Sequence, residues 1–245
     1  MRRIILSIGL TAAALFPIAA AASYTVYLQE GRDNAALRKH VTELLPKPAE
    51  GQAECTFVVL NSKPNNAEQA EAQAAAMTAG VTHLPCLVLS DAEGPYATLL
   101  LQGLKTQDIV KAEELAKSPD RQEKTAQREF DARLYLLFAG CSQKAPEPEQ
   151  LEELVQESRQ LLSDELCTRE LQQLIGLRCL YPLLMKQYAI GHTGAHTPAT
   201  EAKLLEAIAA LEAARDIDPN SKLGKKAHDE RHRLRMARRE ARKYE

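Results

Sequence analysis

Two residues in the first half of this 245-residue chain could carry out chemistry: Cys86 and, three positions earlier, His83. A cysteine thiolate is a nucleophile and a metal ligand, and a nearby histidine could exchange its proton. No carboxylate partner is identifiable for either side chain, and no Cys-x-x-Cys occurs anywhere in the chain. We therefore expect Cys86 to be a small buried strand residue and His83 a solvated loop residue. Thiol chemistry at Cys86 is the alternative.

Three cysteines of the C-terminal half, Cys141, Cys167 and Cys179, are candidates for one disulfide in an oxidising compartment. With Cys55 and Cys86 the total is five, so at least one thiol stays unpaired or bonds between molecules. Cys167 and Cys179 are twelve residues apart, which on a continuous helix separates them by about 18 Å along the axis. They could bond only if that helix breaks, whereas Cys141 could pair with either.

Two histidine pairs have spacings at which metal ligands occur. His192 and His196 bracket Thr-Gly-Ala, and His228 and His232 stand one helical turn apart. Neither pair has an evident third ligand, and the glutamate between His228 and His232 is not where zinc proteases need it. We expect no bound metal and no cofactor.

The C-terminal segment Lys222–Glu245 is strongly basic, with ten Lys and Arg against four acidic residues. It predicts a helix that neutralises the acidic remainder of the chain or docks, through Arg231, Arg235, Arg238 and Arg239, to an acidic partner or an anionic lipid surface. Its apolar face is thin, so stable membrane insertion is not expected. The net charge of −2 for the whole chain argues against nucleic-acid binding.

The N-terminal residues 1–22 have the pattern of a signal peptide. Arg2 and Arg3 precede the apolar run Ile4–Phe16, and Ala20-Ala21-Ala22 forms a cleavage site. We expect export to the periplasm or the extracellular space after cleavage, with retention as an anchor as the alternative.

Residues 23–118 are predicted to form an α/β domain with the element order β-α-β-α-β-β-α, because short apolar or alternating runs alternate with segments of 3.6-residue periodicity. The expected strands are Tyr24–Leu28, Thr56–Leu60, an apolar run opened by Pro85, and Tyr96–Leu101; the expected helices are Asp33–Leu45, an Ala-rich helix capped by Asn65 or Asn66 and ending at Ala79, and Thr106–Lys117. The uninterrupted apolar run Thr56–Leu60 favours a strand buried on both faces.

The stretch Gly80–Leu89, followed by the turn Asp91–Gly94, resembles the cis-proline region of the thioredoxin fold. The resemblance implies a cis Leu84–Pro85 bond and the strand order second, first, third, fourth, with Cys55 at an edge strand and unpaired with Cys86. Gln29–Asn34 occupies the place of the family's Cys-x-x-Cys, and a peroxidatic cysteine is equally missing there. Dithiol exchange as that family performs it is therefore not expected.

In thioredoxins the backbone before the cis-proline pairs with an extended peptide of the substrate. The resemblance therefore implies a binding groove at Leu84 and Pro85, with Gly31, Arg32, Asp33 and Asn34 opposite. Leu84-Pro85-Cys86-Leu87 is also loosely similar to glutathione transferases, which join the same unit to a helical domain.

Residues 119–245 have no strand signal and are predicted to be an antiparallel helical domain. The expected helices are Arg121–Phe138, Glu149–Leu162, Asp164–Tyr181, Leu183–Ile190, Ala199–Ile217 and Lys222–Lys243, with prolines, among them Pro182, as breakers. Ala207, Leu211, Ala214 and Pro219 resemble the second helix of a tetratricopeptide repeat. We expect at most one or two degenerate repeats.

The sequence thus predicts a thioredoxin-like domain without thioredoxin chemistry, followed by a tetratricopeptide-like domain. The leading functional hypothesis is an exported, non-catalytic binding or scaffold protein for a protein or peptide partner. The competing hypothesis is a thiol-dependent enzyme that uses Cys86, either a single-cysteine oxidoreductase or a glutathione-transferase-like protein.

Overall fold

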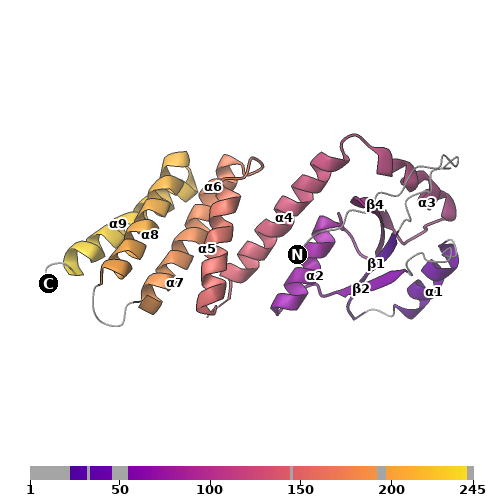
Figure 1. The fold of residues 1–245 in the computed structure, drawn as a ribbon, viewed down its shortest axis with the longest axis horizontal. Coiled ribbons are helices and arrows are strands. Elements are labelled where there is room, and N and C mark those ends of the chain that lie inside the picture. The colour runs from indigo at the N-terminus through magenta and orange to yellow at the C-terminus, as the bar shows by residue number, and fades with distance from the viewer. Residues whose placement is uncertain (1–22, 32–33, 46–54, 144–145, 192–196, 242–245) are drawn as a thin grey trace, which may run out of the picture. The chain divides into compact units, whose positions relative to one another are not determined.

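The structure, a computed structural model, describes residues 23–31, 34–45, 55–143, 146–191 and 197–241. Their contacts divide the chain into two units (Figure 1). The sheet unit consists of Met1–Leu60 and Ala79–Arg121, and the helical unit of Asn61–Thr78 and Gln122–Glu245. The Ala-rich helix α2 (Ala67–Thr78), which the sequence assigns to the first domain, groups with the helical unit. An α/β region followed by an all-α region is therefore the architecture at the coarse level.

The sheet unit is built on four strands in the order β2-β1-β3-β4. β1 pairs in parallel with β2 and antiparallel with β3, and β3 pairs antiparallel with β4. The strands are β1 (Ser23–Gln29), β2 (Thr56–Leu60), β3 (Cys86–Asp91) and β4 (Gly94–Leu100), and the helices of this unit are α1 (Ala35–Leu44), α3 (Thr106–Glu113) and the 3-10 turn Glu114–Lys117. This is the strand order expected from the sequence, and the Leu84–Pro85 bond is cis, as expected.

The core of the sheet unit lies on the two central strands. Val26 and Leu28 of β1 pack with Leu87 and Leu89 of β3, and all four are fully buried. The expectation that β2 is buried on both faces is wrong. β2 is an edge strand in which Leu60 is buried while Val59 is 45% exposed. An apolar run reports the composition of a strand but not its place in the sheet.

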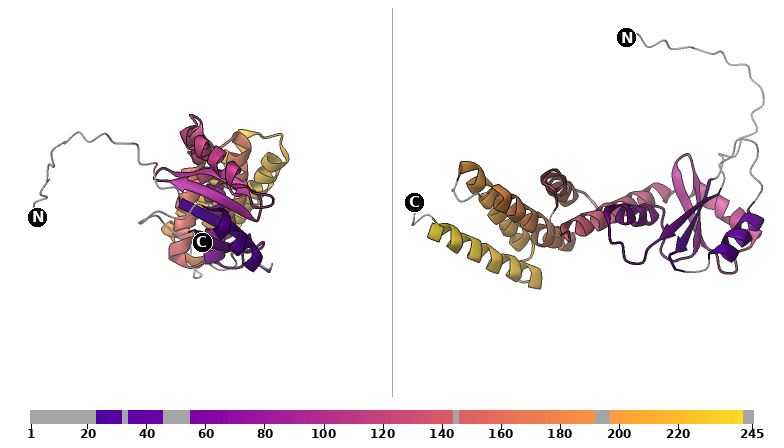
Figure 2. Two further views of the ribbon diagram at one scale, coloured as in Figure 1. Left: turned by 90° about the vertical axis from the view of Figure 1, so that its right-hand side faces the viewer. Right: turned by 90° about the horizontal axis from the view of Figure 1, so that it is seen from below.

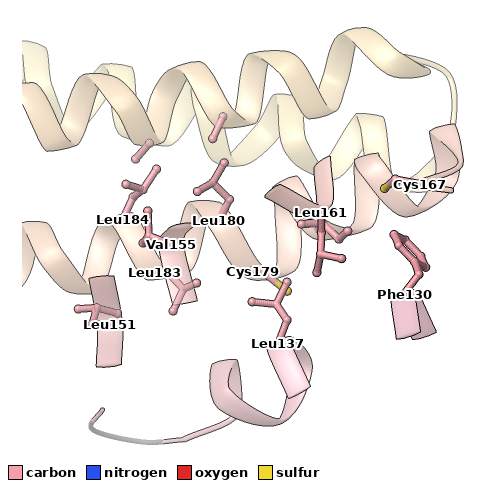
Figure 3. Packing of buried hydrophobic residues seen from close by; sticks show 13 residues of the cluster. Phe130, Leu137, Leu151, Val155, Leu161, Cys167, Cys179, Leu180, Leu183 and Leu184 are labelled. Atoms are coloured by element: carbon pink, nitrogen blue, oxygen red, sulfur yellow. The ribbon is translucent and has the colours of Figure 1, made fainter. Parts of the chain in front are cut away.

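In the helical unit the last helices pack side by side: α5 on α7, α7 on α8 and α8 on α9, with α7, α8 and α9 running in alternating directions (Figures 1 and 2). Besides α2 it contains α4 (Arg121–Cys141), α5 (Pro148–Leu162), α6 (Arg169–Ile175), α7 (Tyr181–Gly191), α8 (Pro198–Ile217) and α9 (Lys222–Ala241). Its largest core cluster combines leucines of α5 and α7 with Phe130 and Leu137 of α4 (Figure 3).

The predicted helix break at Pro182 is wrong, because α6 continues through a π-helical segment, Gly176–Leu180, into α7. The amide of Tyr181 donates to the carbonyl of Gly176, five residues earlier. Pro182 has no amide to donate, and its ring would clash with a carbonyl one regular turn back. A π-turn is a known way to widen a helix locally, and here it lies directly before the proline.

The start of the same helix also differs from the expectation. The helix begins at Arg169, and Thr168 caps it by accepting a hydrogen bond of 3.4 Å from the amide of Leu171. Cys167 therefore precedes the helix, so the spacing argument that separated Cys167 from Cys179 on one continuous helix does not apply.

Candidate functional site

The candidate site of the sheet unit is the edge where β1 ends and β3 begins. Tyr27 is paired with Cys86 in an antiparallel register, so the chain after β1 and the chain before β3 lie at the same end of the sheet. The structure thereby brings Gly31 and Asn34 to the same edge as Leu84 and Pro85. Arg32 and Asp33, also predicted for this groove, lie outside the described residues.

Leu84 has backbone groups available at this edge. Pro85, the next residue, accepts a hydrogen bond of 3.2 Å at its carbonyl from the amide of Leu101. Among the described residues, neither the amide nor the carbonyl of Leu84 has a hydrogen-bond partner. Backbone groups without partners, next to the start of a strand, are what an added peptide strand uses.

Asn34 contributes an unpaired acceptor at the same edge. Its side-chain Nδ2 donates to the carbonyl of Gln29 over 3.2 Å. Its Oδ1 is buried and has no hydrogen-bond partner among the described residues. A buried amide oxygen without a partner costs about 1–3 kcal/mol, so this atom favours a bound donor. The sequence places Asn34 in the groove but contains no signal for its unpaired oxygen.

Gly31 turns the chain at the end of β1. Its φ of +80° lies in the left-handed region, where a side chain would be strained. The space beside its backbone is open, because a Cβ at Gly31 would meet none of the described residues within 4 Å.

Cys86 is fully buried as the first residue of β3. Burial raises the pKa of its thiol to about 11. The neighbouring phenol of Tyr27 also has a raised pKa, first through burial and then through the charge that Cys86 would carry. At neutral pH the Cys86 thiol is therefore protonated and is a poor nucleophile.

His83 is exposed, and its ring Nδ1 lies 3.0 Å from the hydroxyl of Thr82. His228 and His232 are both exposed on α9, while His192 and His196 lie outside the described residues. Within the part of the chain that the structure describes, no three His, Cys, Asp or Glu side chains form a metal-binding group.

The arginines predicted to dock to a partner largely bind the neighbouring helix. Arg231 and Arg235 both contact Glu212 of α8, the first with an Nη1–Oε1 distance of 3.2 Å. Arg238 donates from Nε to Glu201 over 2.6 Å. Arg239 is exposed. These contacts attach α9 to α8, a role that spacing along one helix does not reveal.

A groove in the helical unit was not anticipated from the sequence. It has a volume of about 810 Å³ and lies between the start of α2 and the second half of α4. Tyr135 and Phe138 line it from α4, and Asn65 and Asn66 from the α2 end. Asn66 caps α2, because its side-chain Oδ1 accepts a hydrogen bond of 2.8 Å from the amide of Gln69. No periodicity within either segment predicts that the two meet.

The three cysteines of the helical unit are placed differently from one another. The thiols of Cys141 and Cys179 lie close enough for each to shift the pKa of the other. Cys167 and Cys179 lie well apart in Figure 3. Both Cys167 and Cys179 are buried, and Cys141 is partly exposed.

No protein-family model matches the chain, and no curated protein or solved structure matches it either. None of the helices in the described ranges combines the length and apolar character needed to cross a bilayer.

Proposed function

We propose that this chain is an exported, non-catalytic binding or scaffold protein whose thioredoxin-like sheet unit pairs an extended peptide with the backbone of Leu84. The observation that carries the proposal is the pair of backbone groups on Leu84 without partners among the described residues. Asn34, whose buried Oδ1 has no hydrogen-bond partner in the part of the chain that the structure describes, lies at the same edge of the sheet and supplies an acceptor for a peptide amide.

The chemistry of the edge supports binding over catalysis. The one thiol there, Cys86, is buried and has a pKa raised to about 11. The ring nitrogen of the exposed His83 contacts the hydroxyl of its neighbour Thr82. These features suit a surface that holds a peptide without cleaving or oxidising it.

The test uses peptides selected from a displayed random library on the full chain. Leu84→Pro removes the amide donor, and the matched control Leu84→Ala keeps it while shortening the side chain. We expect Leu84→Pro to weaken binding about tenfold or more, the cost of one buried hydrogen bond, and Leu84→Ala to have a small effect. Circular dichroism checks that each variant is folded. Equal affinity of the wild type and Leu84→Pro would contradict pairing at Leu84.

The second candidate function is a thiol-dependent enzyme at Cys86. The position of Cys86 directly after Pro85, at the edge described above, favours it. Insulin reduction and glutathione conjugation, measured on the wild type and on Cys86→Ser, decide between the two. Turnover that is lost in Cys86→Ser would replace the binding proposal.

Export is a separate proposal that rests on the pattern of residues 1–22. Mass spectrometry of the protein recovered from an exporting bacterial host should give Ser23 as the mature N-terminus. An intact Met1 in the membrane fraction would support the retained anchor instead.

The helical unit is proposed to be a tetratricopeptide-like scaffold. The antiparallel packing of α8 on α9 and the buried Ala207, Leu211 and Ala214 on α8 support it. Such stacked helices provide a surface for a second protein contact.

A further inference from the structure

Cys141 and Cys179 lie on two segments that pack together in the core of the helical unit. Leu137, four residues before Cys141 and therefore on the same face of α4, is fully buried and lies beside Cys179 (Figure 3). Cys141 packs against the cluster that contains both residues. The Cys141 and Cys179 thiols therefore lie in the same packed part of this core, close enough for each to shift the pKa of the other.

A second contact fixes the end of α4 against α7. The ammonium group of Lys186 donates to the carbonyl of Gln143, two residues beyond Cys141, over 2.9 Å. The positive charge of Lys186 is thus near the end of α4, and it contributes to lowering the pKa of the Cys141 thiol.

We propose that Cys141 and Cys179 form an intramolecular disulfide by exchange with a small-molecule disulfide such as oxidised glutathione. This inference does not depend on the proposed peptide binding. It selects Cys179 over Cys167 as the partner of Cys141. Leu137, on the same face of α4 as Cys141, lies beside Cys179, whereas Cys167 lies near Phe130, about three helical turns before Cys141.

The two thiols are suited to successive steps. Cys141 is partly exposed, and the neighbouring thiol of Cys179, with a smaller effect of Lys186, lowers its pKa. The thiol of Cys141 and burial raise the pKa of Cys179. Cys141 is therefore the thiol that meets the oxidant first.

In the first step the Cys141 thiolate attacks one sulfur of the oxidant, forming a mixed disulfide and releasing one small thiol. In the second, Cys179 loses its proton, and its sulfur attacks the Cys141 sulfur and displaces the second small thiol. Two electrons and two protons pass in total from the cysteine pair to the oxidant. Its disulfide is reduced to two thiols while the protein disulfide forms.

The experiment equilibrates the folded, fully reduced chain in buffers of increasing ratio of oxidised to reduced glutathione. Remaining thiols are alkylated, and the chain is cut with trypsin. The cut leaves Cys141, Cys167 and Cys179 in three different peptides, 134–144, 160–169 and 179–186. We expect the peptide 134–144 linked to 179–186 to accumulate as the buffer becomes more oxidising.

Cys167→Ser is the matched control and should leave this linked peptide unchanged, whereas Cys141→Ser should abolish it. The wild-type map needs no substitution, so the result does not depend on the folding of a variant. A link between 134–144 and 160–169, a stable glutathione adduct on Cys141 without the link, or full alkylation of both thiols in the most oxidising buffer would each overturn the proposal.

Discussion

In each unit a polar side chain with little exposure fixes a junction: the sheet unit uses the charged Arg121, 10% exposed, and the helical unit uses the neutral amide of Gln173. Arg121, at the start of α4, binds Asp91 with both Nη atoms, at 2.6 and 2.9 Å, and donates to the carbonyl of Gly94. Its guanidinium also lies 5.6 Å from the ring of Tyr96. The turn between β3 and β4 is thus attached to the first residue of α4.

Gln173 on α6 performs the corresponding task in the helical unit. Its Nε2 donates to the carbonyls of Ala214 at 2.8 Å and Asp218 at 3.0 Å, and its Oε1 accepts from the hydroxyl of Ser221 at 2.8 Å. The residue is 2% exposed. Gly224 lies at the same turn, where a Cβ would come within 2.0 Å of the carbonyl oxygen of Asp218.

The difference teaches which junction responds to solution conditions. An ion pair loses its attraction when its acid is protonated, whereas an amide does not titrate. Of these two junctions, the one that Arg121 fixes should therefore be the acid-sensitive one.

The largest expected effect follows from Arg121→Met. The substitution leaves the Asp91 carboxylate, 14% exposed, without its guanidinium. Removing one partner of such a pair costs about 3–5 kcal/mol. The amides of β3 and β4 should therefore exchange faster with solvent in Arg121→Met. In the matched control Arg128→Met their exchange rates should stay near those of the wild type. Unchanged exchange rates in Arg121→Met would show that the ion pair does not stabilise β3 and β4.

Gln173→Leu should have the next largest effect, because it removes three side-chain hydrogen bonds at the α6–α8 junction. We expect a loss of about 2–3 kcal/mol, at roughly 1 kcal/mol for each hydrogen bond. Urea unfolding with hydrogen-exchange readout on α6 and α8 measures it. The neighbouring Gln172→Leu, which makes the same chemical change, should cost far less; equal losses would point to helix propensity alone.

Acid should weaken the Arg121–Asp91 junction and leave the hydrogen bonds of the Gln173 amide unchanged. The hydrogen bond from Arg121 lowers the pKa of Asp91 below its ordinary 3.8. The stability due to this shift is complete above the ordinary pKa, and it is lost as the pH falls from there through the lower pKa of the folded state. Unfolding of the β3–β4 region should become easier over this range in the wild type and change less in Arg121→Met. The same pH dependence of unfolding in the wild type and in Arg121→Met would show that the Asp91–Arg121 pair is not its cause.

The smallest effect is expected for Arg235→Gln on α9. Arg235 shares Glu212 with Arg231, and its side chain is 48% exposed. Exposed pairs contribute about 0–1 kcal/mol, so the urea midpoint should barely move. A loss as large as that of Gln173→Leu would show that the α8–α9 contact depends on this ion pair.

Local sequence patterns predicted where helices, strands and turns lie better than they predicted which of them contact one another. The turn at Asp91–Gly94, the proline before β3 and the periodicity of α8 are visible in short windows of sequence, and the structure has elements there. The helix break predicted at Pro182 was wrong, because a π-turn widens the helix directly before this proline and the helix continues through it.

Contacts between distant residues left no local signal. Gln173 meets Ser221 across 48 positions, and Arg121 meets Asp91 across 30. The sequence identified the residues at the candidate edge through a resemblance. It could not predict that the Asn34 Oδ1 would have no partner among the described residues, or that burial would raise the pKa of Cys86 to about 11. Both properties arise from packing in three dimensions.

The most direct test of the central claim is the amide signal of Leu84 in the ¹⁵N-labelled full chain, followed by NMR as a selected peptide is added. Pairing with the peptide should shift this signal and slow its hydrogen exchange, together with signals from Gly31 and Asn34. A Leu84 amide that keeps its shift and exchange rate when the peptide is saturating would contradict the account.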